Sequence, residues 1–219
     1  MENEVLGDEL VYIVGSQRLQ NELMASFMEQ ETGIKCEGLN DLRDIPVRDD
    51  RDITRQRLIL WDCLRKNHKT LLADLESYGQ KRFSKGLFIL FNVTQGLGIE
   101  ETTMEWGIKG IFYENDPKEH YPKGVRAVFD GELWFSREIM TRHIQGGKRR
   151  YHIAKKDVAS LSRREVEVIS MVAIGCTNEE IAEKLFISHN TVKTHIYNIF
   201  KKIDVPNRLQ AALWAAKNL

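Results

Sequence analysis

The chain has 219 residues, and its 32 Lys and Arg balance 32 Asp and Glu, so the formal net charge is zero. This balance hides an asymmetry, because 13 basic and 7 acidic side chains follow from Lys148 onward, whereas residues 1–147 carry 19 and 25. The C-terminal part is therefore expected to bind phosphate groups through its excess positive charge. No segment approaches the roughly 20 apolar residues of a membrane-spanning helix, and the three cysteines have no metal-ligand spacing, so we expect a reduced, cytoplasmic protein.

Short apolar runs alternate with helical patterns over the first half of the chain. The expected strands are residues 10–14, 34–39, 58–63, 87–93 and 109–113, and helical spacing is found at about 17–31, 67–78, 100–106 and 117–129. Strands that are apolar throughout need cover on both faces, which a parallel sheet between helices provides. The sequence therefore predicts a doubly wound α/β domain with a five-stranded parallel sheet.

The order of these elements resembles the receiver domain of response regulators. The resemblance places Asp62, at the end of the third strand, where receivers accept a phosphoryl group, and strand ends are where open α/β sheets put their sites. Receivers also have acids after the first strand to hold a divalent cation, and a Lys after the fifth, but Gly15, Ser16 and Glu114 stand at these places. A phosphoryl group would meet repulsion there. We expect Asp62 to be an unphosphorylated strand-end carboxylate.

The chain continues beyond the point at which such a sheet domain would end. Residues 131–137 (GELWFSR) precede a further helix from Glu138 to about Gln145, on which Met140 and Ile144 form an apolar stripe that suits a helix of a second subunit. Glycine and clustered charge then indicate a linker. The predicted organisation is a receiver-like domain with a sixth helix (1–146), a linker (147–160) and an all-α domain (161–219).

The last 59 residues (161–219) have the capping residues and the apolar spacing of four helices. Ser162 and Glu165 form a capping-box pattern, Gly175 ends the first helix, and the next three helices are expected to begin after Asn178, Ser188 and Asn207. Two short helices joined by a tight turn, the second with a basic and polar outer face, suit a helix that enters the major groove.

These residues resemble a known family. The strings LSRREVEVI, GCTNEEIAEKLFIS, TVKTHIYNIFKKI and VPNRLQA are similar to the C-terminal helix-turn-helix of LuxR/NarL-type transcription regulators. The resemblance implies double-stranded promoter DNA as a partner, with Lys193, Thr194 and Tyr197 facing bases. It also implies phosphate contacts by Lys201, Lys202 and Arg208. Thr191 and His195 are weaker candidates for contact with DNA.

The tetrad Trp134, Phe135, Ser136 and Arg137 resembles the W-[FLM]-[TS]-R motif of the VpsT/CsgD-like branch of this family, which binds cyclic di-GMP. In that case Arg137 would stack on guanine and pair with phosphate, Ser136 would donate to phosphate, and Trp134 would form an apolar wall. Phe135 would anchor the segment in the domain, and Lys123 is a tentative phosphate contact. The alternative is that Trp134 and Phe135 only fasten the extra helix.

Three functions stay open at this stage. The first is a dimeric transcription regulator controlled by cyclic di-GMP, acting, by kinship, on biofilm matrix genes. The second is a conventional response regulator phosphorylated on Asp62, and the third is a regulator that needs no ligand and is controlled by its abundance. An enzyme is the least expected class, because no nucleophile with a partnered His, no metal-ligand cluster and no phosphate-binding glycine loop stands in the sequence.

Overall fold

The computed structural model describes residues 9–46, 56–79, 83, 86–146, 161–205 and 207–219. The chain divides into two compact units, residues 1–129 and 130–219. This division puts residues 130–146, which the sequence pattern grouped with the sheet, into the second unit. The linker predicted at 147–160 lies outside the described residues, so the domain limits stay a prediction.

The first unit contains a five-stranded, fully parallel sheet in the order β2-β1-β3-β4-β5. The strands are β1 (Glu9–Val14), β2 (Lys35–Leu39), β3 (Gln56–Asp62), β4 (Leu87–Val93) and β5 (Gly110–Tyr113). The central strands β3 and β4 have fully buried runs, as expected for strands covered on both faces. The predicted fold class is therefore confirmed for this unit.

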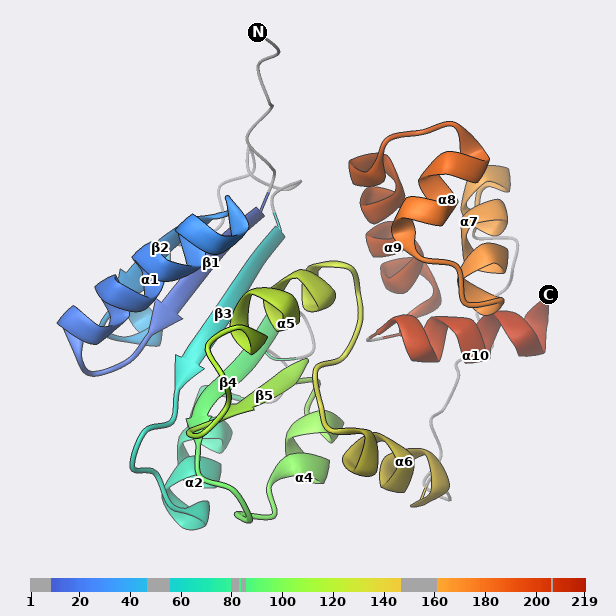
Figure 1. Cartoon of the computed structure of the whole chain (residues 1–219). Helices are drawn as coiled ribbons and strands as arrows, with labels where there is room; N and C mark the ends of the chain where they lie inside the picture. Colours follow the sequence, from blue (N-terminus) through green and yellow to red (C-terminus); the bar gives the residue numbers. More distant parts are fainter. Residues whose placement is uncertain (1–8, 47–55, 80–82, 84–85, 147–160, 206) are drawn as a thin grey trace, which may run out of the picture. The chain divides into compact units, whose positions relative to one another are not determined.

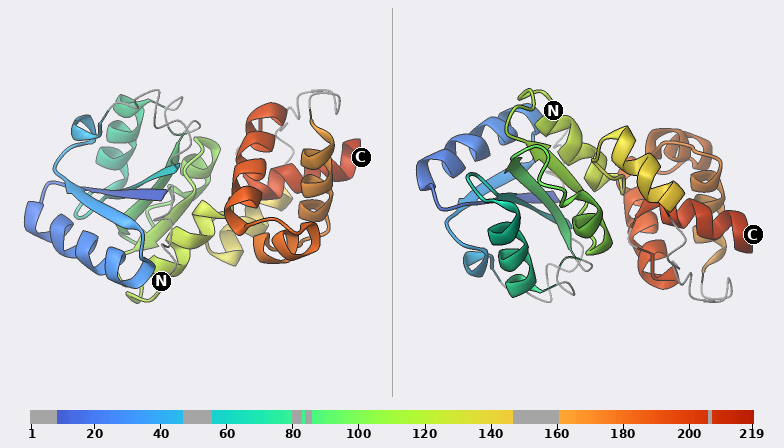
Figure 2. Two further views of the ribbon diagram at one scale, coloured as in Figure 1. Left: turned by 90° about the horizontal axis from the view of Figure 1, so that it is seen from above. Right: turned by 90° about the horizontal axis from the view of Figure 1, so that it is seen from below.

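Helices cover both faces of the sheet (Figures 1 and 2). On one face lie α1 (Arg18–Thr32) and α5 (His120–Phe129), and on the other lie α2 (His68–Tyr78) and α4 (Glu100–Glu105). The segment after β2 contains a short helical turn, η1 (Leu42–Asp44). Asn67 caps α2 by accepting from the Thr70 N–H.

An irregularity near the end of β4 helps to shape the carboxyl edge of the sheet. The register between β4 and β5 shifts between Leu90 and Val93, and Asn92 adopts a left-handed backbone with φ 56°. A bulge of this kind re-aims a side chain. Here the Asn92 amide points back to β3 and donates to Asp62.

Helices are the main regular elements in the described residues of the second unit. These helices are α6 (Arg137–Gly146), α7 (Arg163–Ala173), α8 (Asn178–Leu185), α9 (His189–Ile203) and α10 (Arg208–Asn218). The last four share a core that includes the fully buried Trp214, together with Ile181, Val192 and Ile199. This arrangement confirms the predicted four-helix domain.

Most of the predicted helix boundaries in this domain are correct. Ser162 and Glu165 form the capping box of α7, Gly175 has φ +86°, and Ser188 and Asn207 cap α9 and α10. The prediction for α8 was wrong by one residue, because Thr177 is the cap and Asn178 is the first helical residue. Thr177 and Glu180 form a second capping box there.

Within the described parts of the chain, no helix is long and apolar enough to cross a membrane.

Candidate nucleic-acid interface and ligand motif

The outer face of α9 carries most of the predicted base contacts. Its inner face buries Val192, Ile196, Ile199 and Ile203 in the core of the four helices. This packing turns the side chains at three- and four-residue spacing on the other side outward, and among these Thr191, Thr194 and Lys201 are exposed and Tyr197 is half-buried. The Lys201 ammonium lies 4.1 Å from the centroid of the Tyr197 ring, so a cation and an aromatic face are presented together.

Lys193 lies on the same helix but is largely covered. Its side chain is 15% exposed, and its Nζ lies 3.3 Å from Oδ1 of Asp130. His195, the weaker candidate, is half-buried. Thus one of the three side chains expected to face bases is engaged inside the second unit.

Lys202 is part of the framework of the helix-turn-helix. Its Nζ donates to Oε2 of Glu165 at 2.7 Å, and the same oxygen accepts from the Ser162 N–H at 2.7 Å. Burial raises the pKa of the Glu165 carboxyl, but the hydrogen bonds from Lys202 and Ser162 outweigh it and leave the pKa below its ordinary value. The predicted phosphate contact therefore also ties α9 to the start of α7.

Arg208, at the start of α10, also connects separate parts of the helical domain, as Lys202 does. Its guanidinium donates to Oδ1 of Asn178 at 2.8 Å and to the carbonyl oxygen of Cys176. Burial lowers the pKa of Arg208, and the nearby negative charges of Glu132 and Asp130 only partly offset this effect. Sequence reasoning missed this network, since the partners lie 30 residues or more away along the chain.

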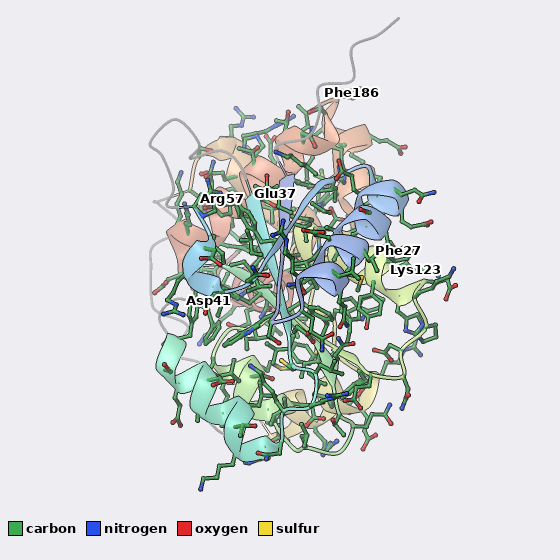
Figure 3. The ribbon with its side chains drawn as sticks, turned by 90° about the vertical axis from the view of Figure 1, so that its left-hand side faces the viewer. Phe27, Glu37, Asp41, Arg57, Lys123 and Phe186 are labelled. Carbon is green, nitrogen blue, oxygen red and sulfur yellow. The ribbon has the colours of Figure 1, made fainter. Side chains whose placement is uncertain are left out.

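Phe186, in the turn between α8 and α9, is 95% exposed and has a left-handed backbone (φ 53°), and Figure 3 labels it at the surface. The sequence pattern places Phe186 only in the tight turn between two helices. The neighbouring Leu185 and Ile187 pack against the core, which leaves Phe186 outside. An exposed aromatic side chain beside α9 is therefore a further candidate for contact with a partner.

The ligand motif forms the entrance to α6. Trp134 and Phe135 are half-buried, whereas Ser136 and Arg137 are exposed. Ser136 caps the helix, since its Oγ accepts from the Ile139 N–H at 3.3 Å. Because the hydroxyl accepts there, its proton is available to a ligand oxygen, next to the N–H groups that the first turn of a helix leaves unpaired.

Charges near the start of α6 favour an anion to a limited extent. Arg137 is the first residue of the helix, and the carboxylate of Glu138 pairs with Arg142 at 3.3 Å, which partly offsets its charge. Lys123 is exposed on α5, in the other unit (Figure 3).

On α6, Met140 is half-buried and Ile139 is buried, and the side chain of Ile144 lies outside those described.

Asp62 lies at the carboxyl end of β3, as predicted, and is 7% exposed. Its Oδ1 accepts from Asn92 Nδ2 at 2.9 Å and from the Leu64 N–H at 3.0 Å. Gly15 faces it closely, because a Cβ there would lie 2.7 Å from Cβ of Asp62 and 2.9 Å from Oδ1 of Asn21. Glu114, at the place of the receiver lysine, accepts from the Thr94 hydroxyl at 3.0 Å. Among the described residues, no three His, Cys, Asp or Glu gather as metal ligands.

Several known proteins are similar in sequence to this chain. Residues 159–215 match the family described as GerE, bacterial regulatory proteins of the luxR family. The chain is 36% identical over 169 residues to the probable csgAB operon transcriptional regulatory protein of Salmonella typhimurium, covering 77% of each chain. It is 35% identical over 169 residues to the CsgBAC operon transcriptional regulatory protein of Escherichia coli, again covering 77% of each. The crystal structure of the regulatory domain of the master biofilm regulator CsgD is 20% identical, with a TM-score of 0.49, and covers 62% of this chain and 98% of that one.

Proposed function

Because the chain belongs to the LuxR family of bacterial regulatory proteins and is a DNA-binding transcription regulator related to CsgD-like proteins, we propose that cyclic di-GMP controls its pairing and its binding to promoters. The observation that carries the proposal is the Trp134–Arg137 motif at the start of α6. It combines an exposed guanidinium, a capping hydroxyl and a half-buried indole within four consecutive residues.

These groups match the chemistry of a cyclic guanine dinucleotide. A guanidinium plane can stack on guanine and also pair with a phosphate, and a helix start offers N–H groups to phosphate oxygens. In the proposed complex Arg137 supplies stacking and charge, Ser136 donates to phosphate, and Trp134 forms the apolar wall. Lys123 remains a tentative phosphate contact, and Phe135 anchors the segment.

Calorimetric titration of cyclic di-GMP against the full chain tests this proposal. We expect Arg137→Ala to weaken binding about tenfold or more, because a charge-assisted hydrogen bond contributes on the order of 1.5–3 kcal/mol. Arg163→Ala is the matched control, since Arg163 is likewise an exposed arginine at the first position of a helix, α7, and it pairs with Glu167 rather than with a residue of the motif. No heat with the wild-type chain, or equal losses in the two variants, would remove the proposal.

The rival function, phosphorylation of Asp62, predicts a different set of responses. An acyl phosphate would promote pairing, and Asp62→Ala would abolish activity without any effect of cyclic di-GMP. We favour the ligand because Asp62 is buried and already hydrogen-bonded to Asn92 and Leu64, and Glu114 stands where a lysine would pair the phosphoryl charge.

A regulator that needs no ligand predicts that Arg137→Ala leaves DNA binding unchanged both with and without cyclic di-GMP. For the target genes, the names of the relatives point to csg operons. We accordingly propose genes for biofilm matrix as targets, and transcript levels after deletion and complementation of the gene test this.

A further inference from the structure

A short acidic segment, Asp130–Gly131–Glu132, contacts the helices of the DNA-binding domain. Leu133 alone separates it from Trp134 in the chain. Both the segment and these helices belong to the unit of residues 130–219. The contacts include a side-chain cluster and a backbone hydrogen bond.

The side-chain cluster is centred on one carboxylate oxygen, Oδ1 of Asp130. It lies 3.3 Å from Lys193 Nζ, accepts from Asn178 Nδ2 at 3.2 Å, and lies 3.7 Å from His189 Nε2. Asn178 begins α8, whereas His189 and Lys193 belong to the first turns of α9. An anionic oxygen thus occupies the place at the start of α9 where a helix-turn-helix meets the anionic backbone and the base edges of DNA.

Gly131 brings the backbone of the segment close to the same helices. Its carbonyl oxygen accepts from the Arg208 N–H at 2.9 Å. Its φ is +86°, and a Cβ at this position would lie 3.1 Å from Cε2 of Phe200 and 3.7 Å from Cγ2 of Ile196. A side chain here would therefore be strained and would press against α9.

We propose that the acidic segment is a built-in inhibitor of DNA binding, in which Asp130 holds Lys193 as DNA would and the segment must leave before α9 can read bases. The second half of the proposal rests on the proposed function: cyclic di-GMP bound at Trp134–Arg137 favours the state in which the segment has left. A ligand shifts such an equilibrium only by its preference for one of the two states.

The test compares variants of the full chain by fluorescence anisotropy, using a duplex enriched by the wild-type chain from a random-sequence pool. We expect Asp130→Asn and Gly131→Val each to bind this duplex about fivefold or more tightly than wild type without ligand, the scale of a typical coupling between sites. Gly131→Val is informative because it changes no charge. Glu183→Gln is the charge-matched control, since Glu183 is an exposed acid on α8 that also becomes neutral in the variant.

The outcomes separate this inference from the proposed function. If cyclic di-GMP raises the wild-type affinity to the level of Asp130→Asn and adds little to that variant, both halves are supported. If both variants bind tightly but calorimetry shows no ligand binding, the inhibitor stands and the coupling to cyclic di-GMP is overturned. If the ligand binds while Asp130→Asn behaves like Glu183→Gln and Gly131→Val like wild type, the inhibitor is overturned and the proposed function survives.

Discussion

At the scale of single residues, Lys109 is the clearest case of a charge inside the sheet domain. It is 4% exposed and stands immediately before β5. Burial lowers the pKa of its ammonium group to about 8, from an ordinary value of 10.5. Between these two values the unfolded chain keeps a proton that the folded chain has lost, so folding stability rises with pH in this range.

We predict that Lys109→Met removes this rise. From pH 8 to about 10.5 the wild-type chain should gain on the order of 1–3 kcal/mol more stability than the variant, since one pKa unit corresponds to about 1.4 kcal/mol. Urea unfolding of the full chain at several pH values measures the difference. Lys118→Met is the control because Lys118 is exposed; parallel curves for wild type and Lys109→Met would contradict the prediction.

At the scale of elements, two adjacent lysines on α9 have different tasks. Lys202 bonds the buried carboxylate of Glu165 and so connects α9 with α7, whereas Lys201 is exposed beside Tyr197. Removing one partner of a buried, hydrogen-bonded charge leaves the other uncompensated. Replacing Lys202 should therefore lower the stability of the helical domain, whereas replacing Lys201 should lower the affinity for DNA.

We predict that Lys202→Ala lowers the unfolding free energy of the helical domain by about 1–2 kcal/mol, whereas Lys201→Ala leaves it unchanged within about 0.5 kcal/mol. In DNA binding, Lys201→Ala should reduce the salt dependence by about one counterion, as expected for a lost phosphate contact. Thermal unfolding and anisotropy at several salt concentrations give both quantities. Equal stability losses in the two variants would show that the Glu165 contact is not important for stability.

The elements themselves could largely be predicted from the sequence, because their signals are local. Apolar period, capping residues and the left-handed Gly175 determine where most helices and strands begin and end. The start of α8 was misplaced because Thr177 and Asn178 are both good caps; only the fold shows that Asn178 bonds Arg208 and Asp130. The partners of Lys202 and Arg208 could not be predicted either, since they are distant in the chain and depend on how the helices pack.

At the scale of the whole molecule, the proposed function requires two chains to come together. Met140 is half-buried on α6, and with Ile144 it is the predicted surface for a second copy. Such an interface is self-complementary in a two-fold dimer. A charged residue placed there is therefore present in both subunits, and the two like charges face and repel each other across the interface.

We predict that cyclic di-GMP raises the sedimentation coefficient of the wild-type chain and that Met140→Glu prevents this rise. Calorimetry should still detect ligand binding to this variant, weakened by the coupling that pairing contributes in the wild type. Thr141→Glu introduces the same charge at the adjacent exposed position, and this variant should form dimers with cyclic di-GMP as the wild type does. Analytical ultracentrifugation with and without ligand measures the effect. Normal pairing by Met140→Glu would exclude this face of α6 as the interface.

The packing around Gly15 limits how this chain can change in evolution. A Cβ at that position meets both Cβ of Asp62 and Oδ1 of the buried Asn21 at less than 3 Å. A single mutation to Asp or Glu there would place side-chain atoms in space that Asp62 and Asn21 already occupy. The absence of a side chain at position 15 is thus a requirement of this packing, and an acid could enter only together with substitutions that make room beside Asp62 and Asn21.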